Sequence, residues 1–417
     1  MRFNSLMLVT AVAFVAASCA GGEDSADGAS SMAMAEANGP VQFEKHDIAP
    51  IRGGYAVTVA DFNNDGRVDV MANSLGVAEV AWLENPTWER HVIFDGASSI
   101  VNQAIADIDG DHVPEVAIQS SFAMQAARSE GMNWVLRSGG DPENTSWDGS
   151  VVDEWETSHH VQWADADGDG TLELYNAPLI GPESLAPTYD QDMASFFWYD
   201  QDTWTRHVID DQIPGIIHRI RPVKWDDSGR DAFLMASFAG ITLYQASGSG
   251  EDMTWQKTIL SPGHVEAAPR LGASDVGMAD DPSGRIIASV EPWHGNEVVV
   301  YTQQGDQWQR RVLYDQIGSG HEIAVVDLNG DGYSDIVAND NSRMSERNPD
   351  ATPGVNVFFS PTDPATGEWT HVKIDDEYAM NSCVGADINV DGEPDIVCTG
   401  GGGMIRWYEN MGEAMTQ

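Results

Sequence analysis

Short runs of alternating hydrophobic and polar residues fill most of the chain from Val41 to Met411. The alternation is clear in Tyr55 to Ala60 and Val68 to Ala72, and again in Ile323 to Asp327 and Ile336 to Ala338. No segment sustains the 3.6-residue period of a helix. Runs this short, rich in β-branched residues and bounded by turn residues, predict an all-β fold.

The same order of strands recurs seven times along the chain. An aromatic-led strand precedes an apolar strand bounded by glycine, then an acidic loop and two further strands. The aromatic-led strands are expected at Phe43–Ile48, Trp88–Ile93, Trp155–Ser158, Trp204–Ile209, Trp255–Ile259, Trp308–Leu313 and Trp369–Ile374. A histidine recurs in register in four of them, and we interpret it as structural. These histidines are His46, His91, His207 and His371.

Repeats of roughly 45 to 65 residues with four strands each are typical of propeller blades and of no common helical solenoid. We therefore expect an all-β, seven-bladed β-propeller over residues 41–412. The chain opens on an aromatic-led strand, Phe43–Ile48, and closes on a third-type strand, Ile405–Glu409. The first strand can thus complete the last blade, which removes two exposed sheet edges.

Five repeats carry a nearly identical acidic loop between their first and second strands. Oxygen ligands at positions 1, 3, 5 and 9 of a glycine-turned loop wrap one hard cation, so we expect up to five structural Ca²⁺ ions coupled to folding. The alternative is an Asp- and Gly-rich turn without metal, and five copies in register favour the cation. The expected ligands are Asp61, Asn63, Asp65, Asp69, Asp107, Asp109, Asp111, Glu115, Asp165, Asp167, Asp169, Glu173, Asp327, Asn329, Asp331, Asp335, Asp387, Asn389, Asp391 and Asp395.

Blades four and five depart from this pattern. Asp226, Asp227 and Asp231 lie too close together, and the stretch 280–284 lacks the alternation. We expect no calcium in either blade.

The loops DFNNDGRVD, DADGDGTLE, DLNGDGYSD and DINVDGEPD resemble the FG-GAP or VCBS repeats of integrin-α-like propellers. This resemblance implies the fold and the calcium and says little about function.

The net charge bears on which partners the protein binds, and the N-terminal residues bear on where in the cell it is located. The net charge of −45 argues against nucleic acid and anionic lipid as partners. Residues 1–18 have the shape of a secretory signal, and the ending Ala16-Ala17-Ser18-Cys19 resembles the bacterial lipoprotein box. We expect residues 19–40 to form a lipidated flexible stalk, so that the protein is exported and held by its lipid on a periplasmic or cell-surface face of a membrane. An ordinary signal peptide is the alternative.

Candidate chemistry gathers just before the first strands of the blades, at the mouth of the expected channel. Blades one, two and seven offer Gly54-Tyr55, Val101-Asn102 and Asn381-Ser382 there, whereas blades three to six each offer a histidine. Histidine can act as a general acid or base, or ligate a transition metal, and arginine can neutralise a carboxylate or enolate. The candidate catalytic residues are His159, His160, His218, Arg219, Arg221, His264, His294 and His321, with Tyr189, Tyr199 and Tyr244 as less well placed acid partners.

The stretch from His159 to Asp165, with Asn176 to Pro182 behind it, resembles the propeller of aldos-2-ulose dehydratases. That family, like the propeller-type ulvan lyases, performs β-elimination on sugars with histidine, tyrosine and arginine at the mouth. The resemblance implies elimination at a carbohydrate, with His160 or His218 removing a proton and Arg219 or Arg221 holding the enolate.

Two other functions stay open at this point: a non-catalytic surface propeller that binds glycans or proteins, and a metal-dependent hydrolase or isomerase. Histidines in four successive blades favour catalysis over adhesion. The sequence has no GxSxG elbow, no phosphate-binding P-loop and no HExxH helix.

Cys383 and Cys398 flank the last acidic loop, and either a cross-strand disulfide or a reduced buried pair fits.

Overall fold

The computed structural model describes residues 41–143, 147–341 and 348–413. The predicted signal peptide of residues 1–18, the lipidated Cys19 and the stalk of residues 19–40 lie outside the described residues. No helix within the described ranges is both long and apolar enough to span a lipid bilayer.

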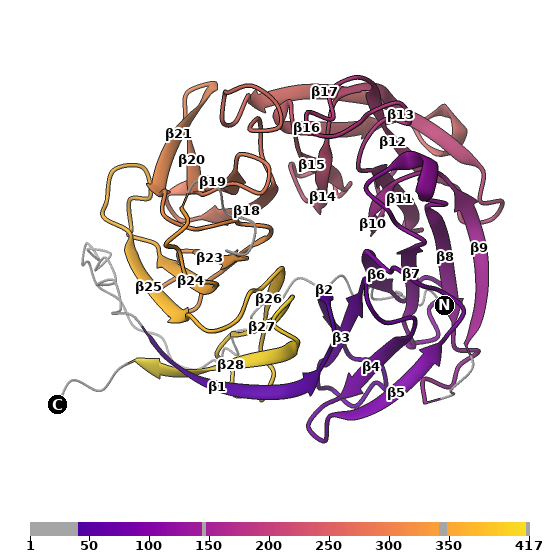
Figure 1. The fold of residues 1–417 in the computed structure, drawn as a ribbon, viewed down its shortest axis with the longest axis horizontal. Helices are drawn as coiled ribbons and strands as arrows, with labels where there is room; N and C mark the ends of the chain where they lie inside the picture. The colour runs from indigo at the N-terminus through magenta and orange to yellow at the C-terminus, as the bar shows by residue number, and fades with distance from the viewer. Residues whose placement is uncertain (1–40, 144–146, 342–347, 414–417) are drawn as a thin grey trace, which may run out of the picture. The chain divides into compact units, whose positions relative to one another are not determined.

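Seven four-stranded antiparallel sheets form a ring (Figure 1), which confirms the predicted seven-bladed β-propeller. Blade one holds β2 (Gly54–Ala60), β3 (Asp69–Ser74), β4 (Val80–Glu84) and β5 (Glu89–Phe94); blade two holds β6 (Asn102–Ala106), β7 (Glu115–Ser120), β8 (Met132–Arg137) and β9 (Asp148–Glu154). Blade three holds β10 (Ser158–Ala164), β11 (Glu173–Pro178), β12 (Met193–Tyr199) and β13 (Arg206–Pro214); blade four holds β14 (Ile217–Val223), β15 (Ala232–Ser237), β16 (Gly240–Ser247) and β17 (Thr254–Ser261). Blade five holds β18 (Asp275–Asp281), β19 (Gly284–Glu291), β20 (Glu297–Gln304) and β21 (Gln307–Tyr314); blade six holds β22 (Ile323–Val326), β23 (Asp335–Asp340), β24 (Gly354–Phe359) and β25 (Thr370–Asp375). Blade seven holds β26 (Ser382–Ala386), β27 (Asp395–Thr399), β28 (Met404–Glu413) and β1 (Val41–Pro50).

The ring closes through the two ends of the propeller, as expected. β1 pairs antiparallel with β28, so the first strand is the outer strand of the last blade, and Figure 1 shows the indigo β1 beside the yellow β28. This pairing satisfies the hydrogen-bonding edge that an open array of blades would leave exposed. In the same blade, a disulfide joins Cys383 to Cys398, which face each other on β26 and β27.

The hydrophobic core lies between neighbouring blades. Inner strands such as β7, β15 and β23 are buried along their whole length, because a sheet packs against each of their faces. One core cluster, for example, packs Leu234 and Leu243 of blade four against Ile287 and Val299 of blade five. Outer strands such as β21 alternate between exposed and partly buried residues, which is the pattern the sequence shows.

Outer strands also explain the four recurring histidines. His91 and His207 lie directly opposite Trp82 and Trp198 on the neighbouring strand and stack on them, with ring centroids 4.2 and 4.1 Å apart. His46 and His371 contact Trp407 and Phe358 in the same register.

The prediction of a strand at Trp155–Ser158 is wrong. The outer strand of blade two is β9, which ends at Glu154, and Trp155 lies in the turn that follows. The indole packs over Phe197, and the Arg206 guanidinium sits 4.3 Å from the indole centroid. The tryptophan therefore marks packing against blade three and not the start of a strand.

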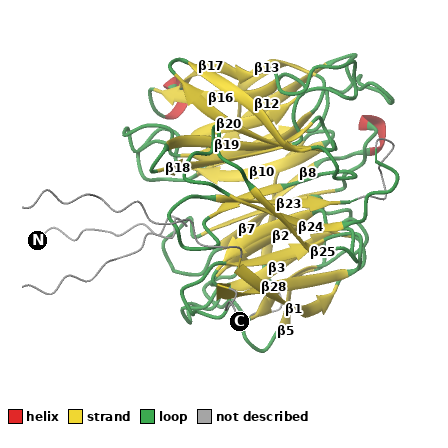
Figure 2. Ribbon diagram, turned by 90° about the vertical axis from the view of Figure 1, so that its left-hand side faces the viewer, coloured by secondary structure: helices red, strands yellow, loops and turns green. Residues whose placement is uncertain are grey.

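The two ends of each innermost strand carry different chemistry. The mouth residues precede or open these strands, whereas the acidic loops follow them, as at Ala60 in β2 and Ala164 in β10. Figure 2 shows loops at both faces of the ring. Since a strand rises about 3.3 Å per residue, the seven residues of β2 place its two ends roughly 20 Å apart.

Candidate active site

Tyr55, near the start of β2, lies between two histidines from other blades. Its hydroxyl oxygen is 3.2 Å from Nε2 of His159 in blade three and 3.0 Å from Nε2 of His321, which precedes β22 of blade six. Both imidazole rings meet the phenol edge-on. One phenol group thus connects residues of blades one, three and six.

His218 and His294 complete the group. His294 comes from the loop between β19 and β20, and its Nε2 lies 3.1 Å from Nε2 of His218. His218, His294 and His321 offer ring nitrogens that all lie within 4.8 Å of one another, and the His159 ring centroid is 5.1 Å from that of His218. We call Tyr55 and these four histidines the central cluster.

Register shifts at the starts of three innermost strands help to aim these side chains. The shift falls between Gly54 and Val57 in β2, between Ser158 and His160 in β10, and between Ile217 and Arg219 in β14. Tyr55, His159 and His218 lie within these three intervals. A β-bulge releases a residue from the regular pleat and redirects its side chain, so the backbone itself points these groups at the centre.

Backbone carbonyls fix the tautomers of two histidines. Nδ1 of His218 is 2.8 Å from the Ser274 carbonyl oxygen, and Nδ1 of His321 is 2.9 Å from that of Asn381. Because a carbonyl only accepts, both Nδ1 atoms donate, and both Nε2 lone pairs face the cluster. The hydroxyl of Tyr55 therefore donates to Nε2 of His321.

Burial sets the protonation of the central cluster. Burial lowers the pKa of His159 to about 3 and that of His294 to about 4, and it lowers the pKa values of His218 and His321 well below the usual value. Burial likewise raises the pKa of Tyr55 above its usual value. At neutral pH the cluster therefore presents neutral imidazoles beside a protonated phenol.

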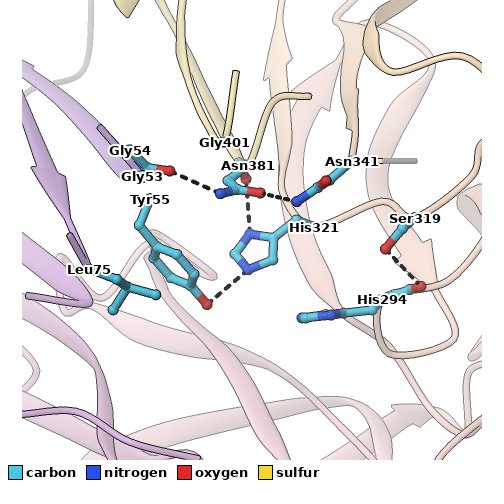
Figure 3. Close-up of a pocket in the computed structure, with 10 residues that line it drawn as sticks. All are labelled: Gly53, Gly54, Tyr55, Leu75, His294, Ser319, His321, Asn341, Asn381 and Gly401. Atoms are coloured by element: carbon cyan, nitrogen blue, oxygen red, sulfur yellow. Dashed lines mark hydrogen bonds between the residues drawn. The ribbon is translucent and has the colours of Figure 1, made fainter. Parts of the chain in front are cut away.

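A cavity of about 220 Å³ opens beside the central cluster (Figure 3). Its lining is Gly53, Gly54, Tyr55, Leu75, His294, Ser319, His321, Asn341, Asn381 and Gly401. In Figure 3 a dashed line joins the Tyr55 hydroxyl to the His321 ring near the centre of the view, and His294 extends toward them from the opposite side to Tyr55. Drug-sized ligands occupy pockets of roughly 300 Å³ or more, so this cavity suits a single small ring or the end of a chain.

The two candidate arginines are already paired with protein groups. The Arg219 guanidinium is 2.9 Å from Asp275 Oδ1 through Nε and also pairs with Glu322. Arg221 donates from Nε to the Val276 carbonyl oxygen at 2.6 Å and lies 3.4 Å from Asp275. Both therefore link blades four, five and six, which differs from the expectation that one of them holds a substrate anion.

His264 is not brought into the central cluster. β18 begins at Asp275, so His264 lies in the connection that precedes this strand, where it forms an isolated bridge with Gly272. Its Nδ1 is 3.0 Å from Glu297 and its Nε2 is 3.3 Å from Glu266. The sequence expectation took this histidine for the residue just before the first strand of blade five, which the length of the connection rules out.

His160 lies inside the ring beside the cluster and is 2% exposed. Neither ring nitrogen has a hydrogen-bond partner among the described residues. Burial lowers its pKa well below the usual value, so the imidazole is neutral. It does not line the cavity described above, which argues against the direct contact with substrate that the sequence suggested.

Two of the three tyrosines considered as acid partners are structural. Tyr199 donates its hydroxyl to Asp153, and Tyr244 donates to Asp210, each from a third strand to the outer strand of the preceding blade. Tyr189 packs edge-on against Trp293. The tyrosine of the site is Tyr55. Sequence reasoning placed it at the mouth of blade one but assigned it no role, because no neighbouring residue in the chain marks it as chemical.

The five acidic loops share one conformation. In each, the carboxylate at position 1 accepts a hydrogen bond from the backbone N–H at position 6, as from Gly66 to Asp61 at 2.9 Å. Asp107, Asp109 and Glu115 bring ligand atoms within 4.8 Å of one another, and in blade three the corresponding group is Asp165, Asp167 and Asp169.

The acid at position 9 has a second task that spacing alone does not reveal. In blades one, six and seven its two oxygens accept backbone N–H groups from the loop and from the end of the third strand, as when Asp335 accepts from Leu328 and Ser360. A carboxylate oxygen has two lone pairs, so these atoms can also face a cation. Asp327 Oδ1 in the same loop is buried with no hydrogen-bond partner among the described residues, which fits a site built for an ion.

Comparisons with known proteins agree with the fold, and one match overlaps the part of the chain that holds several residues of the site. The family model "Aldos-2-ulose dehydratase, beta-propeller domain" matches residues 131–304, and "FG-GAP-like repeat" matches residues 61–118. The first match includes His159, His218 and His294, whereas Tyr55 and His321 lie outside it.

Among curated proteins, the chain is 23% identical over 326 residues to Aldos-2-ulose dehydratase of Phanerodontia chrysosporium, which covers 72% of this chain. The alignment spans 30% of the length of that relative. A chain in "Crystal structure of BBS1N in complex with ARL6DN, soaked with mercury" superposes with a TM-score of 0.52 at 9% identity, over 89% of this chain and 96% of that one, and shows the fold alone. Two of the three resemblances expected from the sequence are confirmed. The chain contains an FG-GAP-like repeat, and it is similar to the propeller of aldos-2-ulose dehydratases. The resemblance to propeller-type ulvan lyases stays a prediction.

Proposed function

We propose that the protein is a carbohydrate-active carbon–oxygen lyase that eliminates across a sugar carbon–carbon bond at the central cluster. The supporting observation is the Tyr55 hydroxyl, held between two neutral imidazoles beside a cavity. β-Elimination needs one group that takes a proton next to a carbonyl or carboxylate and another that gives a proton to the leaving oxygen. A neutral histidine and a protonated tyrosine supply these two roles.

His294 is the base in this proposal, because it lines the cavity and its low pKa keeps the ring neutral at neutral pH. Its Nε2 donates to Nε2 of His218, so Nδ1 is the nitrogen that can accept the proton. His294 first takes the α proton, and the carbon–hydrogen electron pair forms an enolate with the neighbouring carbonyl or carboxylate. The enolate then collapses to the new carbon–carbon double bond as the carbon–oxygen bond breaks. Tyr55 donates its proton to the departing oxygen, and an N–H of His159 stabilises the phenolate that results. The contact between His294 and His218 offers the path by which the abstracted proton leaves the base.

The ion pairs of Arg219 give it a positioning role. Arg219 is 8% exposed and pairs with Asp275 and Glu322, and Glu322 directly follows His321 in the chain. The pair fixes the segment that carries His321 against blades four and five. Arg219 acts in the proposal by holding the imidazole in place and not by touching the sugar.

The central cluster also fits a transition metal. His218, His294 and His321 are neutral imidazoles within 4.8 Å of one another, and two of them are oriented by backbone carbonyls, as metal-ligating histidines are. When bound there, an ion would polarise the oxygen of the substrate carbonyl or carboxylate. His159, which is outside this set of three, would then keep its hydrogen bond with the Tyr55 hydroxyl.

The acidic loops, in the proposal, bind Ca²⁺ and hold the scaffold. Their shared conformation and converging carboxylates support this role, and the like charges crowded in each turn need a cation to remain close. These loops lie at the ends of the innermost strands that are far from Tyr55 and His159. We therefore assign calcium to stability and not to the chemical step.

We also propose export and anchoring through Cys19. The supporting observation in the described residues is the Cys383–Cys398 disulfide, since disulfides persist in oxidising compartments. Cell fractionation of the protein and of Cys19→Ala tests this: the wild type should sediment with membranes and the variant should be soluble.

The function is tested by incubating the purified chain, with Ca²⁺, with a panel of uronic-acid polysaccharides and keto-sugars and following the ultraviolet absorbance of the new conjugated double bond. Tyr55→Phe removes one oxygen and keeps the ring, so it should slow elimination by about 10²- to 10⁴-fold, the range for loss of a general acid. Tyr189→Phe is the matched control and should react like the wild type. Saccharide binding without any product from the wild type would favour a non-catalytic glycan-binding propeller.

A further inference from the structure

The seam where the ring closes carries a group of metal-ligand type that lies outside the central cluster and the acidic loops. Glu44 and Glu409 face each other directly across β1 and β28, and His46 lies two residues beyond Glu44. One ligand atom from each of the three side chains lies within 4.8 Å of the other two. His46 Nε2 is 2.7 Å from Glu409 Oε2.

The pairing of the two glutamates is unfavourable by itself. Like charges directly opposite on neighbouring strands destabilise a sheet. Lys45, which lies between Glu44 and His46 in the chain, does not relieve them, because its ammonium group is bound to Glu377 at 2.7 Å. The seam therefore brings two carboxylates together where a cation would be stabilising.

The neighbouring side chains hold the donors in place. His46 packs against Trp407 with ring centroids 4.6 Å apart, which fixes its ring, and Asn389 donates from Nδ2 to Glu409 Oε1 at 3.0 Å, which leaves Oε2 facing His46. Imidazole and carboxylate ligands held in this way suit a borderline cation such as Zn²⁺ better than they suit Ca²⁺, which prefers oxygen alone.

Blade one provides a comparison within the same molecule. Glu89 on β5 faces Glu84 on β4, and His91 lies opposite Trp82, with its Nε2 2.8 Å from Glu84 Oε2. Among the described residues, however, three donor atoms come within 4.8 Å of one another at the seam and not in blade one. The stacked histidine is thus common to several blades, and the second carboxylate within reach is particular to the seam.

We propose that Glu44, His46 and Glu409 bind a divalent transition-metal ion of the Zn²⁺ type, with water completing its coordination on the exposed side. The ion would join two strands whose hydrogen-bonded side chains, His46 and Glu409, are 363 positions apart in the chain. Binding to the closed ring alone would stabilise the folded state by mass action. This site is independent of the proposed catalysis.

The test uses the full chain in Ca²⁺-containing buffer with Zn²⁺ as the probe. Equilibrium dialysis gives the number of ions bound, and thermal unfolding gives the Zn²⁺-dependent rise in midpoint. Glu44→Gln keeps the packing of His46 on Trp407, so it should fold normally. It should bind one Zn²⁺ fewer, or bind that ion at least about tenfold more weakly, since even changes beyond the ligands cost 10- to 100-fold. The rise in midpoint should shrink with it.

Glu89→Gln is the matched control in blade one and should behave like the wild type. The measurements are repeated in a His294→Ala background, so that any ion at the central cluster is weakened equally in every protein compared. Equal stoichiometry, affinity and midpoint shift for wild type and Glu44→Gln would overturn the proposal. An equal loss in Glu89→Gln would also overturn it, because the binding would then be a general property of surface acids.

Discussion

Blades one, two, three, six and seven place clustered carboxylates after their innermost strands, whereas blades four and five place basic side chains there. In blade five the turn after β18 is a tight hairpin, and Arg285 binds Asp280 through two nitrogens at 2.7 and 2.9 Å. The same guanidinium donates to the Trp225 carbonyl oxygen and lies 4.5 Å from the indole centroid.

Blade four uses two basic residues. Lys224 is 2.8 Å from Asp231, and Arg230 donates to the Ala166 and Gly248 carbonyl oxygens. Asp231 in turn accepts the backbone N–H of Asp165 in the loop of blade three. The comparison teaches that one position in the fold can be stabilised in two ways: two blades carry a cation in the chain, and the other five, in our proposal, take Ca²⁺ from solution.

Of the changes proposed here, removal of calcium should lower the free energy of unfolding the most. A site held at a hundred times its Kd contributes about 2.7 kcal/mol, so emptying several loops should lower the free energy of unfolding by several kcal/mol and lower the midpoint steeply. Thermal unfolding with and without a chelator measures it. An unchanged midpoint would show that the loops hold themselves together without a metal.

Arg285→Met should destabilise blade five by about 2 kcal/mol, because it removes a two-point ion pair and a cation–π contact while keeping the apolar stem. The loss should be the same with and without Ca²⁺, as measured by urea unfolding in both buffers. A loss that appears only in the presence of Ca²⁺ would contradict the assignment of blade five to side-chain cations.

His112→Gly should stabilise the protein by about 1 kcal/mol. Four of the acidic loops have glycine at position 6 with a positive φ, whereas blade two has His112 there at φ 73°. A side chain in this region costs about 1–2 kcal/mol, offset in part by the greater freedom of glycine in the unfolded chain. Chemical denaturation of the wild type and of His112→Gly measures the difference in the free energy of unfolding. A destabilised variant would mean that the imidazole itself supports the loop.

The smallest change in the free energy of unfolding is expected from the ion pair between Asp210 of blade three and Lys257 of blade four, and this change should depend on pH. Burial alone would raise the pKa of Asp210, but hydrogen bonds from Lys257, Gln212 and Tyr244 lower it below its usual value. The paired carboxylate therefore contributes stability above the unfolded-state pKa near 3.8, and this contribution is lost as pH falls through the lower folded-state value. Asp210→Asn should cost about 1 kcal/mol at pH 7 and progressively less below pH 4, measured by urea unfolding. A constant difference across that range would contradict the ion pair.

Local patterns carry the scaffold, which is why it could be predicted. The seven repeats and the five loops each depend on residues close together in the chain, and the closing strand follows from the types of strand found at the two ends of the repeat array. The strand expected at Trp155 failed because an aromatic residue that packs against blade three looks the same in sequence as one that opens a strand.

The central cluster could be predicted only in part. Histidines just before innermost strands were visible, but the role of Tyr55 depends on register shifts and on distances across the ring. His264 was misplaced because the connection before β18 is long, and the pairing of Arg219 with Asp275 and Glu322 joins three blades. Contacts between blades of this kind leave no periodic trace in the sequence.

The division of roles between Tyr55 and His294 can be measured directly by NMR in D₂O, with a saccharide that the wild type converts. Tyr55→Phe should form almost no unsaturated product yet still exchange the α proton of the sugar for deuterium, because the base remains. His294→Gln should lose both exchange and product. Elimination by Tyr55→Phe at the wild-type rate would contradict the account.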